Sequence, residues 1–114
     1  LHGVGIEYFS NGNTKKMCEF VREKKHGEYI CYYENGIIRS KDNFYDDERE
    51  GECVEYFSNG SIKMKDIFHN GEKHGIGFTY YANGGVRSKF NYDGNKKQGK
   101  CIEWTVSITV LMMR

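Results

Sequence analysis

The stretch that decides the fold is Gly27-Glu-Tyr-Ile-Cys-Tyr-Tyr-Glu-Asn-Gly36, continued by Ile-Ile-Arg-Ser-Lys-Asp-Asn-Phe at residues 37–44. Its first half is rich in aromatic and β-prone side chains and has no apolar stripe at helical spacing, which predicts a strand. Asn35–Gly36 is the pair that most readily takes positive φ, so we expect a two-residue type I′ turn there. Residues 37–44 then return as a second strand, which completes a β-hairpin.

A two-residue turn would fix which residues oppose one another across this hairpin. The expected pairs are Tyr33 with Ile38, Tyr32 with Arg39, and Ile30 with Lys41. This register places apolar side chains on both faces of the hairpin, with Lys and Arg stems lying over Tyr rings. Cross-strand pairs of this kind contribute roughly 0.2–1 kcal/mol each.

The same pattern recurs with a period of 24 residues. The recurring glycines are Gly3, Gly27, Gly51, Gly75 and Gly99. An aromatic follows five residues after each, at Tyr8, Tyr32, Tyr56, Tyr80 and Trp104. A basic residue recurs at Lys15, Arg39, Lys63 and Arg87. A period of 20–50 residues indicates a stacked array, so we predict units 3–26, 27–50, 51–74 and 75–98, joined by polar turns, and a partial unit 99–114.

The repeated unit resembles a known family. Its pattern Gly-x-x-x-x-Tyr-Tyr-x-Asn-Gly-x-Ile-(Lys/Arg)-x-Lys-x-x-Phe is similar to the MORN repeat, and more closely to the bacterial variant of YwqK-type antitoxins. The resemblance covers residues 1 to about 104. It implies an all-β fold, an elongated single-layer antiparallel β-meander of tandem hairpins. It also implies scaffolding and protein–protein contact, toxin neutralisation in antitoxin members, and an affinity for anionic phospholipids.

Enzyme motifs do not accompany the array. MORN-type arrays are appended to some phosphatidylinositol-phosphate kinases, but this sequence has no Gly-Lys-Ser/Thr, no His-Arg-Asp and no Asp-Phe-Gly. Carboxylates such as Glu7, Glu55 and Glu103 share one repeat phase, whereas a catalytic site needs different residues that converge. We therefore expect a protein that is not an enzyme and has no catalytic residues and no cofactor.

Histidines and cysteines also follow the period. His26 and His74 lie two units apart, about 19 Å at 4.8 Å per strand, too far to share a zinc ion. We expect no metal site and interpret the histidines as turn residues. Cys53 and Cys101 are likewise too far apart for a disulfide. Cys18 and Cys31 could be diagonal neighbours across the first inter-repeat turn, so the sequence leaves a bridge between them open without indicating it. The chain also lacks Cys-x-x-Cys, which favours thiols in a reducing, cytoplasmic compartment.

The overall charge is nearly balanced, with 17 Lys and Arg against 16 Asp and Glu. This balance does not favour a nucleic acid partner. The sequence has no apolar run of about 18 residues, so we expect no transmembrane helix in it. It begins at Leu1 without a signal region or an initiator Met, so we expect it to be cut from a longer chain or processed.

One surface has the potential to bind a partner. Basic residues recur beside tyrosines, and the candidate binding residues are Tyr32, Arg39, Lys41, Tyr56, Lys63, Lys65, Tyr80, Arg87 and Lys89. We expect the basic ones to project from one face at intervals of about 10 Å. Such a surface suits an acidic protein or, alternatively, lipid headgroups. The alternative is that these are solvated strand residues without a binding role, whose positive charges are balanced by neighbouring Glu residues.

The repeat stops after Trp104. Residues 105–113 form an uncharged, β-branched run, Thr-Val-Ser-Ile-Thr-Val-Leu-Met-Met. We expect this segment to cap the last hairpin or to pair with a second chain as an edge strand, which gives a homo-oligomer.

Overall fold

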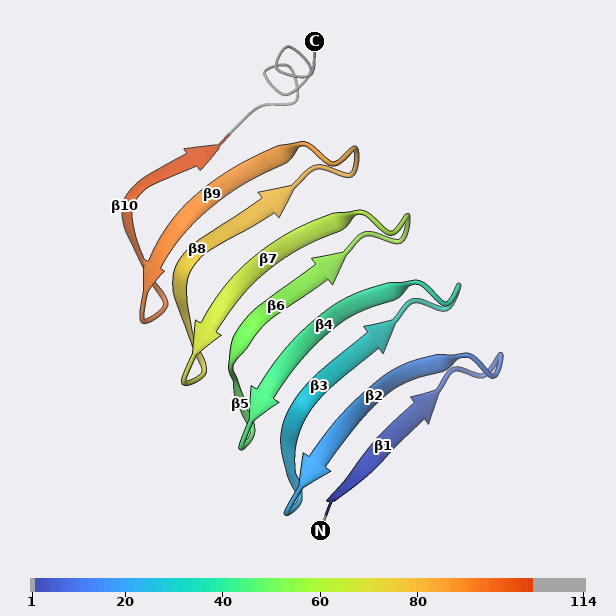
Figure 1. Cartoon of the computed structure of the whole chain (residues 1–114). Helices are drawn as coiled ribbons and strands as arrows, with labels where there is room; N and C mark the ends of the chain where they lie inside the picture. Colours follow the sequence, from blue (N-terminus) through green and yellow to red (C-terminus); the bar gives the residue numbers. More distant parts are fainter. Residues whose placement is uncertain (1, 104–114) are drawn as a thin grey trace.

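A computed structural model describes residues 2–103, which form one antiparallel sheet of ten strands (Figure 1). The strands are β1 (His2–Tyr8), β2 (Thr14–Val21), β3 (Lys24–Tyr32), β4 (Ile38–Tyr45), β5 (Glu48–Arg49), β6 (Gly51–Tyr56), β7 (Ile62–His69), β8 (Glu72–Tyr80), β9 (Val86–Asp93) and β10 (Lys96–Glu103). Their order in the sheet follows the chain, and β5 is a short piece that pairs with β4 just before β6. The all-β meander of tandem hairpins is confirmed.

The sheet is a single layer that measures 51 × 36 × 16 Å. A layer this thin has no enclosed core, and no described side chain is less than 2% exposed. Burial is shared between the two faces. Cys18, Cys31, Cys53 and Phe68 are buried on one face, and Ile30 and Val54 on the other. Stability therefore accumulates hairpin by hairpin, as in other repeat proteins.

The Asn-Gly turns differ from the prediction. Gly36 takes φ 90° but Asn35 does not have positive φ, so the turn is not type I′. The Gly36 N–H donates to the Tyr33 carbonyl at 3.0 Å, and the Tyr33 N–H donates to the Ile37 carbonyl at 2.8 Å. This is a three-residue loop, a type I turn followed by a glycine bulge. The Asn35 side chain selects it, because its Oδ1 accepts a hydrogen bond from the Ile37 N–H at 3.0 Å.

The longer loop changes the register beside the turn. Tyr32 pairs with Ile38, so the predicted pairs of Tyr32 with Arg39 and of Tyr33 with Ile38 are wrong. Arg39 is the extra residue of a bulge between Ile38 and Ser40. Further from the turn, Ile30 opposes Lys41 as predicted.

Type I′ geometry occurs at the other ends of the strands, in the polar turns between hairpins (Figure 1). The central residues with positive φ are Arg22–Glu23, Asp46–Asp47, Asn70–Gly71 and Gly94–Asn95. The flanking residues pair directly, as Val21 does with Lys24. The sequence predicted polar turns here but not their type, because two of the four contain no glycine.

Candidate functional site

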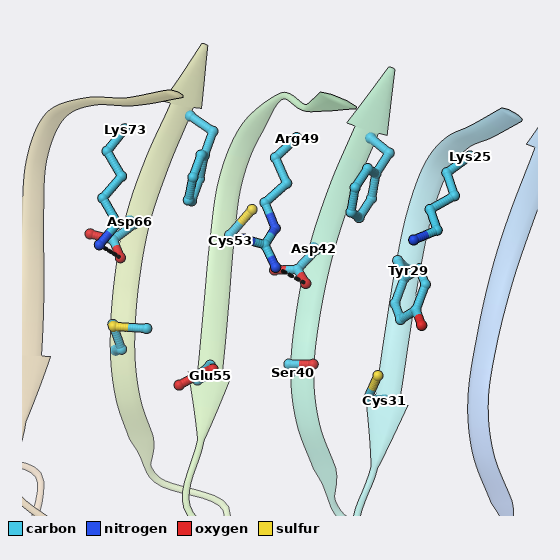
Figure 2. A pocket seen from close by; sticks show the side chains of 13 residues that line it. Lys25, Tyr29, Cys31, Ser40, Asp42, Arg49, Cys53, Glu55, Asp66 and Lys73 are labelled. Carbon is cyan, nitrogen blue, oxygen red and sulfur yellow. Dashed lines mark ion pairs between the residues drawn. The ribbon is translucent and has the colours of Figure 1, made fainter. Parts of the chain in front are cut away.

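A groove of about 390 Å³ crosses one face of the sheet over strands β3 to β8 (Figure 2). We call this side the groove face. The residues that line the groove are Lys25, Tyr29, Cys31, Ser40, Asp42, Phe44, Arg49, Cys53, Glu55, Met64, Asp66, Phe68 and Lys73. Side chains alternate along each strand, so neighbours such as Ile30, Lys41 and Val54 lie on the opposite face.

The hollow exists because the first strand of each inner unit bends. Gly27, Gly51 and Gly75 have φ of 89°, 86° and 79°, a conformation that costs glycine little because it has no Cβ. The register shifts at these points: Cys18 pairs with Tyr29, whereas Phe20 pairs with Lys25. The extra residues kink the strand, as Figure 1 shows for β3 and β8. The recurring glycines therefore shape the groove.

A stack of cations and aromatic rings forms one wall of the groove. The Lys25 Nζ lies 4.9 Å from the centroid of the Tyr29 ring and 5.1 Å from that of Phe44. The Arg49 Cζ lies 6.0 Å from the Phe44 centroid and 5.3 Å from that of Phe68. Each cation thus bridges rings of two strands or two units. Such contacts contribute about 0.5–1 kcal/mol at exposed sites, so this wall joins neighbouring hairpins.

Two aspartates lie on the floor of the groove. Asp66 is 5% exposed and pairs with Lys73 at 3.7 Å, and Asp42 pairs with Arg49 at 3.9 Å. Gly77 on β8 leaves the room that Asp66 occupies, because a Cβ at Gly77 would overlap the carboxylate. The lining holds three bases and three acids. The lining of the groove therefore contains both polar and apolar side chains and has no net formal charge.

The cysteines of the groove face are buried, free thiols. Cys18, Cys31 and Cys53 form no disulfide, and the side chain of Cys101 lies outside the described residues. Burial raises the pKa of the Cys53 thiol to about 11 and also raises the pKa of Cys18. Both thiols therefore stay protonated at neutral pH, and a protonated thiol is a poor nucleophile.

The predicted basic residues lie in different environments. Lys41 pairs with Glu28 at 3.5 Å and Lys65 with Glu52 at 3.9 Å, both on the opposite face. Lys89 lies 6.0 Å from the centroid of the Phe78 ring.

The other predicted row lies closer to the groove. Arg39 and Lys63 line a hollow of about 250 Å³ that shares Ser40 and Glu55 with the groove. Arg87 is exposed at the same repeat phase. The six basic residues therefore do not all project from one face of the sheet, as we had expected.

The predicted tyrosines are half-buried. Tyr32, Tyr56 and Tyr80 each stand at the end of a strand before an Asn-Gly turn. The Tyr56 carbonyl accepts a hydrogen bond from the Tyr33 Oη at 2.6 Å, which ties two units together. None of the three rings has a cation over it among the described residues, so they are not interleaved with the basic side chains as expected.

The wall of the groove was not predicted from the sequence. Its cations Lys25, Arg49 and Lys73 recur two residues before a repeat glycine, and Lys97 continues this period outside the lining of the groove. This period was visible in the sequence. That these cations meet the aromatics of neighbouring strands was not visible, because it depends on the kinks at the glycines.

The histidines lie in strands rather than in turns. The His69 Nδ1 lies 2.9 Å from the Glu50 carboxylate, and the Asn70 N–H donates to the same carboxylate at 2.8 Å. Hydrogen bonds from Asn70 and then His69 lower the pKa of Glu50. No group of three or more potential metal ligands occurs in the described part of the chain.

Residues 105–113, the predicted edge strand, lie outside the residues that the structure describes.

Among residues 2–103 no helix is suited to crossing a membrane. The chain finds no match among curated proteins. The family model of the MORN repeat variant matches residues 1–22, 25–47 and 49–70, and that of the MORN repeat matches residues 67–86. The three matches to the variant start 24 residues apart, as the hairpins do. MORN repeats are non-catalytic modules that often mediate contacts with proteins or membrane lipids. The chain belongs to the MORN repeat variant family.

Proposed function

We propose that this chain is a non-enzymatic scaffold that binds a protein partner in the groove. The observation that carries the proposal is the groove itself, a hollow of about 390 Å³ that extends across neighbouring hairpins. Its lining combines apolar, aromatic and paired charged side chains. Protein interfaces have this mixture, with aromatic and Arg side chains enriched at their centres. A toxin is one class of partner that such a scaffold would neutralise.

Ties between units support this function because they hold the groove in one shape. At the Asn-Gly edge, the Asn35 Nδ2 donates to the Ser58 carbonyl at 3.4 Å and the Asn59 Nδ2 donates to the Ala82 carbonyl at 3.2 Å. At the other edge, the Asp47 N–H donates to the Lys25 carbonyl at 3.0 Å. A surface fixed in this way loses less conformational entropy on binding.

The ion pairs of the groove and of the opposite face favour a protein over an anionic membrane as the partner of these surfaces. Attraction to anionic lipid contributes about 1 kcal/mol for each basic residue near the surface. In the groove, the two pairs Arg49–Asp42 and Lys73–Asp66 offset that attraction. The ion pairs of Lys41 and Lys65 do the same on the opposite face.

Site-specific cross-linking tests the proposal. A photoreactive amino acid replaces Ser40 in the groove or, as the matched control, Lys41 on the opposite face of the same strand. Irradiation in extract of the source cells should give one product from position 40 that is absent from position 41. The cross-linked protein is identified, purified and titrated against the unmodified chain. A product from position 41 alone, or no binding of the purified protein, would refute the proposal.

Liposome flotation tests the lipid alternative. Vesicles containing phosphatidylserine are mixed with the wild-type chain and with a variant in which six basic residues become Glu: Arg39, Lys41, Lys63, Lys65, Arg87 and Lys89. Our proposal predicts that neither protein floats at physiological salt. Salt-sensitive flotation of the wild type alone would favour the lipid alternative.

A further inference from the structure

We propose that the row Lys15, Arg39, Lys63 and Arg87, which we call the turn-side row, binds an acidic segment of the partner. The segment is in polyproline II conformation and has a carboxylate at every third residue. The inference rests on the proposed function and names the chemistry of the partner. It comes from the charges that the fold leaves unpaired and from their spacing.

The turn-side row differs from the other basic rows because its members form no ion pair with a side chain that the structure describes. No carboxylate oxygen of a side chain that the structure describes lies within 4.0 Å of a charged nitrogen of these four residues, and all four residues are exposed. In contrast, Lys41 and Lys65 pair with glutamates, and Arg49 and Lys73 pair with aspartates. The unpaired cations therefore form one line at the strand ends that carry the Asn-Gly turns.

Two further observations show that the row lies beside the groove. Arg39 and Lys63 line the hollow of about 250 Å³ that adjoins the groove, and Glu55 is the one acidic residue of that lining. Two cations and one carboxylate leave the hollow with a net positive charge. The Lys63 Nζ also lies 5.8 Å from the centroid of the Phe57 ring. A segment bound along the row would thus continue into the groove.

The spacing of the row selects the conformation of the segment. Successive members stand two strands apart, about 9.6 Å at 4.8 Å per strand. In a polyproline II helix, every third side chain lies on the same side at intervals of about 9.3 Å. In an extended strand, the third side chain points to the opposite side. In an α-helix, the seventh residue lies about 10.5 Å away, a mismatch that grows with each unit.

The turns keep this spacing fixed. Asn11 and Asn13 each donate a side-chain hydrogen bond to the Glu34 carbonyl, at 3.3 and 2.9 Å. The Ser61 Oγ donates to the Ala82 carbonyl at 3.0 Å. Each turn is thereby attached to the next, beside the cations that follow it in sequence. A fixed line of charges binds a stiff ligand of matching period without ordering either one.

Fluorescence anisotropy with two labelled peptides tests the inference. One peptide is four repeats of Glu-Pro-Pro, and the other has the same composition with its four Glu in a block. We expect the periodic peptide to bind at least 10-fold more tightly at low salt. The double variant R39Q/K63Q should abolish this preference, and K41Q/K65Q, which removes the same charge from the opposite face, should keep it.

Four results would overturn the inference. The peptides could bind equally well, the two double variants could weaken binding equally, or neither peptide could bind. Phosphatidylserine vesicles that compete with the periodic peptide would also overturn it, in favour of a lipid headgroup. A cross-link from position 40 together with any of these results would leave the groove as the protein site and reject only the acidic segment.

Discussion

The Cζ atom of Arg49 lies 5.3 Å from the centroid of the Phe68 ring, although the two residues belong to different hairpins. Arg49 also lies over Phe44 of the preceding strand and pairs with Asp42. One side chain thus connects three strands. We infer that the array is held together at its kinked side by such cations, in addition to its backbone hydrogen bonds.

Replacement of Arg49 by Met should lower the free energy of unfolding by about 1–2 kcal/mol, since two cation–π contacts and one half-exposed ion pair are lost. The matched control is Arg39→Met, which removes an exposed Arg without such contacts and should change stability by less than about 0.5 kcal/mol. Urea unfolding followed by circular dichroism measures both. Equal effects of the two substitutions would contradict the bridging role of Arg49.

Gly77→Ala should destabilise the chain by about 1–3 kcal/mol, because the added methyl group meets the Asp66 carboxylate and the Tyr92 ring. Gly3→Ala is the control. Gly3 also lies in a strand without positive φ, and an added Cβ there meets nothing within 4 Å. Thermal unfolding should therefore show a lower Tm for the Gly77 variant alone. A similar Tm for both variants would show that Asp66 does not need this space.

Asn35→Ala should cost about 1 kcal/mol or more, since it removes the Oδ1 acceptor of the turn and the Nδ2 donor to the next unit. Asn35→Asp keeps the acceptor and removes only the donor, so it should cost less. The two variants differ in urea midpoint by the contribution of the hydrogen bond within the turn. The difference between Asn35→Asp and the wild type gives the contribution of the hydrogen bond to Ser58. If Asn35→Asp is as stable as the wild type, the tie to Ser58 contributes nothing.

Cys53 predicts a specific loss of stability in alkali. Burial raises its pKa from 9.0 to about 11 in the folded chain. The unfolded chain releases this proton at lower pH than the folded chain does, so the free energy of unfolding falls between pH 9 and pH 11. Cys53→Ala should be less stable at pH 8 but should lose less on the way to pH 11. Parallel curves for the two proteins would contradict the burial of this thiol.

The period and the identity of each strand were predictable, because turns and strands repeat in the same order four times. Ile30 opposite Lys41 was predicted correctly from the position of the hairpin alone. The turn type was not, because Asn35–Gly36 suits either a type I′ turn or a type I turn with a glycine bulge. The Asn35 side chain decides between them through hydrogen bonds to Ile37 and to the next unit.

The groove could not be predicted from the period. Its hollow depends on kinks at Gly27, Gly51 and Gly75, and positive φ at these residues is not visible in a sequence. The division of the basic residues also depends on local detail. Arg39 is the extra residue of a bulge, so it borders the hollow with Ser40, whereas Lys41 turns away to Glu28.

The affinity of the cross-linked partner for two variants tests the central claim most directly. Ser40→Tyr fills the groove, and Lys41→Tyr adds the same side chain to the opposite face of β4. Titration calorimetry with the purified partner should show binding at least 10-fold weaker for Ser40→Tyr and within two-fold of wild type for Lys41→Tyr. If Lys41→Tyr weakens binding and Ser40→Tyr does not, the partner binds the opposite face and the groove is not its site.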